Sequence, residues 1–319
     1  MTHRYGTQRI ALPWRLLPLA LLAPLASCLP KDTRPPPSSV LFTASPSAAA
    51  AMPKTPVQTE DGWEISFERA LITIGRASVD GDSCNSYSEA RYTRVLSLLG
   101  APAREKISES FALGHCDFGF AIVNAESDSL LGSTATDADL AFLRTPGEDK
   151  YAGLSGISFY VEGTASKGTR RETFAWKFRG RMRLEECSEM VDGKPVQGLD
   201  LVQDGAVSVD VTIAPERIFA DGVDPDMSKL RFDAIAAADI EAGDADGEVT
   251  LDELGLVAYD TLSSVADGAY AQPTADAALP FMTLEDFVYT GVAPTVVRYR
   301  GNGKCQPQLR PARGGGGPG

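Results

Sequence analysis

The stretch Phe174-Ala175-Trp176-Lys177-Phe178 decides the fold class, because large aromatic side chains alternate along it with small or polar ones. A period of two residues is that of a β-strand with one face buried in a core and the other facing solvent. Ile157, Phe159 and Val161 alternate in the same way on the other side of a turn near Gly168. The two runs therefore predict two strands separated by a turn, each with one buried face.

Short runs of the same kind recur along the chain, separated by glycine and aspartate turns. Several short strands with such turns favour a mostly β class, a β-sandwich-like domain, over a parallel α/β sheet. One segment departs from this pattern, since the apolar residues from Tyr92 to Leu99 have helix-like spacing and predict a short helix within residues 84–100. Further strands are expected near residues 63–67, 70–74, 207–213 and 296–299.

A basic stripe continues the Phe174 run on the face opposite the aromatic side chains. The interpretation we favour is a solvated sheet face whose charges are balanced by neighbouring carboxylates. The alternative is a binding site for an anion or a lipid headgroup. The stripe consists of Lys177, Arg179, Arg181 and Arg183.

The chain as a whole is acidic, with 30 Lys and Arg against 43 Asp and Glu and a formal net charge of −13. Binding to nucleic acid relies mainly on cationic contacts to phosphates, so no nucleic acid is expected as a partner. Acidity of this size favours solubility and the binding of cations.

The first residues are typical of an export signal. Three arginines lie before or at the start of an apolar run from Leu16 to Leu22, and small residues follow it. The run is too short, and too often interrupted by proline, for a membrane span of about 20 apolar residues. The end of the signal, Leu25-Ala26-Ser27-Cys28, resembles the lipobox of bacterial lipoproteins.

This resemblance implies that residues 1–27 are a lipoprotein signal peptide and that Cys28 becomes the mature N-terminus, with a lipid on its sulfur. It implies a protein of the bacterial cell envelope, attached to a membrane through its lipid anchor. Because Leu29, and not Asp, follows the cysteine, resemblance to enterobacterial sorting rules implies the outer membrane. The alternative is cleavage after a nearby alanine, which would leave Cys28 free.

Composition divides the rest of the chain. Residues 28–61 are rich in Pro, Ser and Ala, and they predict a disordered tether. Residues 62–309 contain the alternating runs and are expected to form the β-sandwich-like domain. Residues 310–319 are a glycine-rich tail.

Four cysteines follow Cys28, and an even number in an exported chain predicts two disulfides. None has the CxxC spacing of a zinc or redox site, so a metal-thiolate centre is not favoured. Four cysteines allow three pairings, and sequence alone does not choose between them. The pairing we prefer joins Cys84 to Cys116, closing a local loop, and Cys187 to Cys305, tying the C-terminus to the sheet.

The acidic stretch 239–254 resembles the calcium loop of an EF-hand. With Gly247 at loop position 6, where a sharp turn is required, oxygen-bearing residues fall at positions 3, 5, 7, 9 and 12. Val249 supplies the apolar residue at position 8. The resemblance implies Ca²⁺ as the ion and, as its ligands, Asp244, Asp246, Glu248 through its main chain, Thr250 and Glu253.

Position 1 departs from the EF-hand pattern, because Ala242 has no side-chain oxygen. Asp239 or Glu241 could replace it if the loop bulges around Gly243, and a main-chain carbonyl is a further alternative. Helix-like spacing on both sides predicts an EF-hand-like insertion at about 226–258. No second hand is visible and the flanks are not rich in Met, so a weak structural site is expected rather than a calcium switch.

Catalytic patterns are sparse. His115 is the only histidine after the signal peptide, and no Gly-x-Ser-x-Gly elbow accompanies it. The function we expect is that of a non-enzymatic, lipid-anchored extracytoplasmic binding or structural protein that binds calcium for stability, with an unidentified protein partner. The alternative is a metal-handling or hydrolytic protein that uses His115 beside Cys116 and Asp117.

Overall fold

The structure is a computed structural model and describes residues 34–88, 90–101, 104–148, 154–262, 270 and 281–309. Contacts divide the chain into residues 1–35 and residues 36–319, and the elements below all belong to the second unit. The predicted signal peptide, the predicted lipidation site at Cys28 and the glycine-rich tail lie outside the described residues. Among the helices of the described segments, none is long and apolar enough to cross a membrane.

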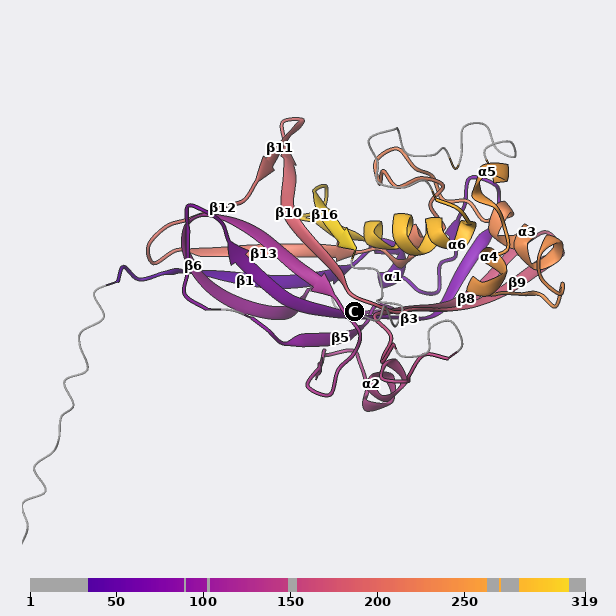
Figure 1. Cartoon of the computed structure of the whole chain (residues 1–319), viewed down its shortest axis with the longest axis horizontal. Coiled ribbons are helices and arrows are strands. Elements are labelled where there is room, and N and C mark those ends of the chain that lie inside the picture. Colours follow the sequence, from indigo (N-terminus) through magenta and orange to yellow (C-terminus); the bar gives the residue numbers. More distant parts are fainter. Residues whose placement is uncertain are drawn as a thin grey trace, which may run out of the picture. The chain divides into compact units, whose positions relative to one another are not determined.

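Sixteen strands of the described segments form one curled sheet (Figure 1). Its main path runs in the order β14-β9-β8-β3-β6-β1-β13-β15, and the remaining strands pair at its sides. The predicted mostly β class is thus confirmed. The strands are β1 (Ser38–Pro46), β2 (Val57–Gln58), β3 (Glu64–Asp80), β4 (Cys84–Ser86), β5 (Thr93–Ser97), β6 (Glu105–Ile122), β7 (Leu130–Leu131), β8 (Phe159–Lys167), β9 (Arg170–Phe178), β10 (Met182–Val191), β11 (Lys194–Gln197), β12 (Leu199–Leu201), β13 (Ala206–Ile213), β14 (Glu248–Val249), β15 (Val297–Tyr299) and β16 (Lys304–Leu309).

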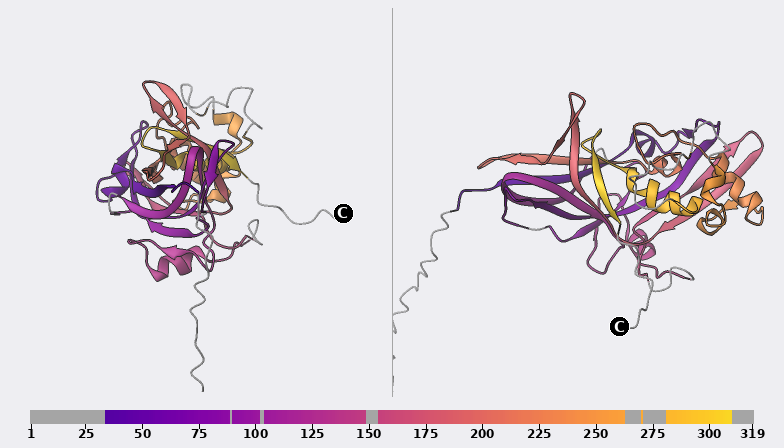
Figure 2. Two further views of the ribbon diagram at one scale, coloured as in Figure 1. Left: turned by 90° about the vertical axis from the view of Figure 1, so that its left-hand side faces the viewer. Right: turned by 45° about the horizontal axis from the view of Figure 1, so that its top comes forward.

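The helices are short, and most of them lie in the last third of the chain. Those between residues 233 and 296, coloured orange to yellow, gather at the end of the sheet near β8 and β9 (Figure 1, Figure 2). The helices of the described segments are α1 (Ala48–Ala51), α2 (Asp137–Leu143), α3 (Asp233–Glu241), α4 (Leu251–Leu254), α5 (Tyr259–Leu262), α6 (Leu284–Asp286), the 3-10 turns η2 (Pro215–Phe219) and η4 (Ala293–Val296), and the π turn η3 (Phe287–Val292).

The alternating run that predicted the class forms β8 and β9, which pair antiparallel across Gly168. Val161 lies opposite Trp176, and both side chains are buried. Phe174 packs edge-on against Phe219, with ring centroids 5.2 Å apart. Burial of aromatic side chains of this size contributes on the order of 2–3 kcal/mol each, which makes this face the core of the domain.

The tether prediction is wrong from residue 38 onward. Residues 38–46 form β1, which pairs with β6 on one side and with β13 on the other. Val40 and Phe42 are 1% exposed, and the Phe42 ring lies 5.4 Å from that of Phe118. Composition did not predict this strand, because the apolar run Val-Leu-Phe is short and lies among Pro, Ser and Ala residues. In the fold, β6 and β13 form hydrogen bonds with the backbone of this run on its two sides.

The helix predicted within residues 84–100 is also wrong, because β4 and β5 occupy that segment. β5 pairs with β3, and Val95 and Leu96 are both buried although they point to opposite faces. A strand buried on both faces gives a continuous apolar run that periodicity does not separate from a helix.

Both preferred disulfides are confirmed. Cys84 of β4 bonds to Cys116 of β6, and Cys187 of β10 bonds to Cys305 of β16. They span 32 and 118 residues respectively, so each removes conformational freedom from the unfolded chain. The second bond holds the C-terminal strand on the sheet.

Candidate functional site

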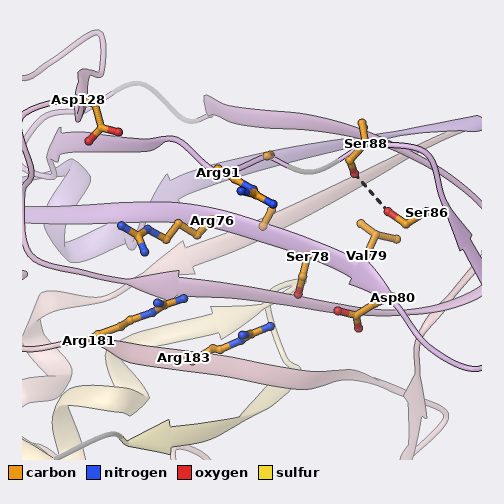
Figure 3. Close-up of a pocket in the computed structure, with 12 residues that line it drawn as sticks. Arg76, Ser78, Val79, Asp80, Ser86, Ser88, Arg91, Asp128, Arg181 and Arg183 are labelled. Carbon is orange, nitrogen blue, oxygen red and sulfur yellow. Dashed lines mark hydrogen bonds between the residues drawn. The ribbon is translucent and has the colours of Figure 1, made fainter.

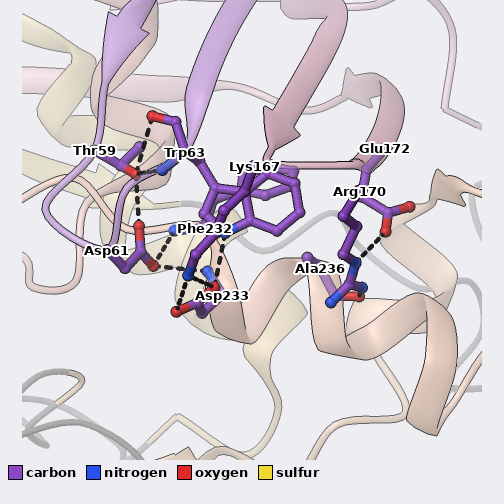
Figure 4. A network of polar contacts seen from close by, with 9 residues as sticks. All are labelled: Thr59, Asp61, Trp63, Lys167, Arg170, Glu172, Phe232, Asp233 and Ala236. Carbon is purple, nitrogen blue, oxygen red and sulfur yellow. Dashed lines mark hydrogen bonds and ion pairs between the residues drawn. The ribbon is translucent and has the colours of Figure 1, made fainter.

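The acidic loop follows α3, and the start of this helix is fixed to the sheet (Figure 4). The Asp61 carboxylate accepts hydrogen bonds from the backbone amides of Phe232 and Asp233, at 2.8 and 2.7 Å. The Asp233 carboxylate accepts from Trp63 Nε1 and Lys167 Nζ, at 2.7 and 2.8 Å. Burial alone would raise the pKa of Asp233, but these hydrogen bonds and the charges of Lys167 and Arg170 together outweigh it and hold the pKa below its usual value.

The middle of α3 is held by Arg170 of β9 (Figure 4). The guanidinium donates to the Ala236 carbonyl at 2.5 Å and to Glu172 Oε1 at 2.6 Å. It also lies over the Trp63 ring, 5.4 Å from the ring centroid. These contacts tie the sheet to the helix that carries Asp239.

The buried side chain of Asp239 forms hydrogen bonds with the backbone of the acidic loop. Its side chain is 2% exposed, and its carboxylate accepts from the amides of Asp246 and Gly247, at 3.1 and 3.4 Å. Its carbonyl accepts from the Ala245 amide at 3.0 Å. Gly247 has φ +84°, a conformation that glycine adopts without steric cost. The loop therefore folds back over the end of α3.

Carboxylate oxygens of Asp239, Asp244 and Glu253 lie within 4.8 Å of one another. Gly243 permits this approach, since a Cβ there would stand 2.0 Å from Glu253 Oε1. Three negative charges at this separation repel one another, and a cation between them would turn that repulsion into attraction. Oxygen ligands of this kind suit a hard ion such as Ca²⁺.

The other predicted ligands serve the backbone of the loop. Asp246 Oδ1 accepts from the Glu248 amide at 2.8 Å, and the Glu248 side chain is exposed. Thr250 caps α4, with its hydroxyl accepting from the Glu253 amide at 3.2 Å. Glu253 Oε2 returns the contact by accepting from the Thr250 amide at 2.7 Å. Neither Asp246 nor Thr250 belongs to the three-carboxylate cluster.

Two residues of β9 that were not predicted to belong to the site, Thr173 and Trp176, hold the far side of the loop. β14 pairs parallel with β9, and the Gly247 carbonyl accepts from the Thr173 amide at 2.8 Å. Trp176 Nε1 donates to the Val249 carbonyl at 2.8 Å. The loop is thus supported by hydrogen bonds to the edge of the sheet, whereas the loop of a paired EF-hand is supported by a second hand. The sequence offered one signal for this contact, Trp176 itself, because a buried tryptophan needs a hydrogen-bond acceptor for its indole N–H.

The helices around the loop differ from the expected pair. α3 has nine residues, but α4 after the loop has four, a single turn. The second long helix of an EF-hand is not formed. Thr283 and Asp286 form a capping box at the start of α6.

His115 lies on β6, away from this cluster. Its Nδ1 is 2.8 Å from Asp200 Oδ1, and the two side chains are 56% and 90% exposed. The neighbouring Cys116 is in a disulfide and offers no thiolate. Among the described residues, the group of acidic, histidine or cysteine side chains placed to hold a metal does not include His115.

Comparison with known proteins finds no matching family model, no matching curated protein and no matching solved structure. Function is therefore inferred from the residues and their geometry.

Proposed function

We propose that this chain is a lipid-anchored, extracytoplasmic binding or structural protein that holds Ca²⁺ in the loop from Asp239 to Glu253. The observation that carries the proposal is the cluster of three carboxylates, Asp239, Asp244 and Glu253, within 4.8 Å. Calcium takes several oxygen ligands in flexible geometry, which suits a loop that offers carboxylates and main-chain carbonyls. In this proposal Asp239 supplies the oxygen that Ala242 lacks.

The ion is proposed to be structural. α3 is tied to the sheet by Asp61 and Arg170, and β14 is tied to it by Thr173 and Trp176. A cation between Asp239 and Glu253 would join α3 to α4, which directly follows β14, and so would stabilise an anchored loop rather than move a helix outward. Lone extracellular sites bind in the range of about 10⁻⁴–10⁻³ M, so the ion would be held where calcium is abundant.

The lipid anchor rests on the sequence at Cys28. Since β1 begins at Ser38, residues 29–37 would separate the lipid from the sheet. Fully extended, nine residues span at most about 30 Å. The proposed anchor would therefore keep the domain close to the membrane rather than at the end of a long tether.

Two measurements test the proposal. Thermal unfolding of the purified chain with calcium, and again with a chelator, is expected to show a higher melting temperature with the ion. Mass spectrometry of the protein isolated from membranes is expected to find Cys28 as a diacylated N-terminus. If calcium does not change the melting temperature, the proposal of a bound ion is wrong. If Cys28 carries no lipid, the proposal of a lipid anchor is wrong.

The second candidate, a metal-handling or hydrolytic protein, has one observation in its favour. Asp200 holds His115 Nδ1 at 2.8 Å, an arrangement that orients the other ring nitrogen for a metal or a proton. Metal analysis of the purified wild type and of His115→Ala separates the two candidates. A transition metal that is lost on substitution favours the second, and calcium alone favours the first.

A further inference from the structure

A cavity of about 560 Å³ opens between the end of β3 and the chain that follows β4 (Figure 3). All of the last five residues of β3, Arg76 to Asp80, line it. Successive side chains of a strand point to opposite faces of a sheet, so a cavity that touches all five runs along the edge of the strand rather than over one face. Its opposite side is lined by Ser86, Ser88, Ala90 and Arg91.

This edge of β3 has no neighbouring strand among the described residues. Ile74 and Gly75 pair with β5 and with β6 at the same time, so these two strands lie on opposite sides of β3. β5 pairs with β3 only as far as Gly75, whereas β6 pairs with it up to Asp80. Backbone groups of successive residues point alternately to the two sides of a strand, so part of the N–H and C=O groups of residues 77–80 face the unpaired side.

A β-bulge opens the gap beside this edge. The pairing of β3 with β6 shifts between Gly75 and Ser78, and Arg76 has φ +50°, which a residue with a side chain seldom adopts. The Arg76 amide donates to the Tyr92 carbonyl at 3.1 Å, and a Cβ on Gly75 would stand 2.4 Å from that oxygen. The two segments are therefore in close contact at Gly75. A bulge bends its strand, so β3 can leave the returning chain directly after this contact.

The two faces of the edge differ in polarity. Ala77 and Val79 are buried, and so is Ala90 across the cavity. Ser78 is half-buried and Asp80 is exposed, on the other face of the strand. The edge therefore offers an apolar inner face of small side chains and a polar outer face.

The charged side chains around the cavity are of both signs. Arg76 Nη2 donates to Glu126 at 2.7 Å, and Arg183 Nε pairs with Glu185. Asp128 lines the cavity as well. These pairs neutralise the charges at the rim, which favours a ligand without net charge over an ion.

We propose that the edge of β3 binds an extended peptide segment of a partner protein, which adds a strand to the sheet. An unpaired edge presents N–H and C=O groups at strand spacing, and the backbone of an extended peptide matches them. At about 3.3 Å per residue, the five lining residues span roughly 16 Å, which suits a segment of four or five residues. Alternation predicts small apolar side chains toward Ala77 and Val79 and polar ones toward Ser78.

Strand addition at this edge goes beyond the proposed function. The cavity contains no residue of the calcium loop, and peptide binding there requires neither the ion nor the lipid. Loss of peptide binding would leave the predicted calcium and lipid results unchanged.

Hydrogen–deuterium exchange of the full chain tests the proposal. The probe is the uncharged pentapeptide Thr-Val-Thr-Val-Thr, acetylated and amidated at its ends and titrated into the millimolar range. It is expected to slow exchange of the backbone amides within residues 77–80 by roughly tenfold or more, because they gain partners. The same peptide, N-methylated at every residue, has lost its backbone donors and is expected to give no protection.

Two variants of β4 separate the cavity from its surroundings. Ser86→Trp places a large side chain in the cavity and is expected to abolish the protection. Asn85→Trp is the matched control, because Asn85 is also exposed but lies on the other face of the strand and does not line the cavity. Circular dichroism checks that both variants fold.

Three results would overturn the proposal. The first is the absence of protection by the unmethylated peptide, and the second is equal protection by the methylated one. The third is an equal loss of protection in Ser86→Trp and Asn85→Trp.

Discussion

The acidic loop and the arginine-lined cavity were assembled in opposite ways. Asp239, Asp244 and Glu253 come from one stretch of fifteen residues, and their spacing is visible in the sequence. Arg76, Arg91 and Arg183 come from three segments that only a bulge and strand register bring together. Both lie on the same curled sheet. A local motif can be recognised before folding, whereas a site built across strands exists only in the folded protein.

The largest expected effect on stability comes from removing a disulfide, and its size differs between the two bonds. Replacing Cys187 and Cys305 by serine is expected to lower the free energy of unfolding by about 5 kcal/mol, against about 4 kcal/mol for Cys84 and Cys116, because the first pair closes the longer loop. Chemical denaturation measures both. Since Cys84 is on β4 with Ser86, loss of the second pair is expected to weaken peptide binding at the cavity more than the calcium response. Equal losses would contradict this.

Gly75→Ala is expected to damage the cavity selectively. The new Cβ would meet the Tyr92 carbonyl at 2.4 Å and Thr93 Cα at 2.7 Å, and overpacking of this kind costs about 1–3 kcal/mol. Denaturation and hydrogen–deuterium exchange with the peptide measure the effect, while the calcium-dependent shift stays. Gly100→Ala is the matched control, because its Cβ would have no neighbour within 4 Å and only the cost of its positive φ, about 1 kcal/mol, remains.

Asp239→Asn is expected to remove the stabilisation by calcium. At about 10 mM calcium, a site in the expected affinity range contributes about 1.4–2.7 kcal/mol, and the variant loses an anionic ligand at its centre. Glu241→Gln is the control, since Glu241 is exposed and outside the carboxylate cluster. Melting curves with calcium and with chelator provide the measurement. If Glu241→Gln loses the increment and Asp239→Asn keeps it, Glu241 supplies the missing ligand.

The smallest effect concerns the anchor of α3. Hydrogen bonds from Lys167 and Trp63 depress the folded pKa of Asp233, so its contribution to stability is present above the unfolded pKa of about 3.9 and is lost as pH falls through the folded value. The side chain is 51% exposed, which limits the contribution to under about 1 kcal/mol. Asp233→Asn is expected to melt lower than wild type at pH 6 and to approach it near pH 3. A difference that grows toward pH 3 would have the wrong sign.

Sequence patterns predicted the parts of this molecule that depend on neighbours along the chain. Alternation along β8 and β9 predicted the class. The patterns failed to predict two strands that are buried on both faces. β1 was hidden in a Pro, Ser and Ala-rich stretch, and β5 had the spacing of a helix.

By itself the sequence determined a mostly β chain with two disulfides and an acidic loop whose carboxylate spacing resembles that of an EF-hand, because period, cysteine number and residue spacing are local properties. Tertiary structure decided that Asp239 is buried beside Asp244 and Glu253 and that β9 pairs with the loop, since both depend on contacts across the fold. It also decided that Arg179 is buried while Arg183 faces a cavity. These outcomes follow from register and burial, which residue spacing does not specify.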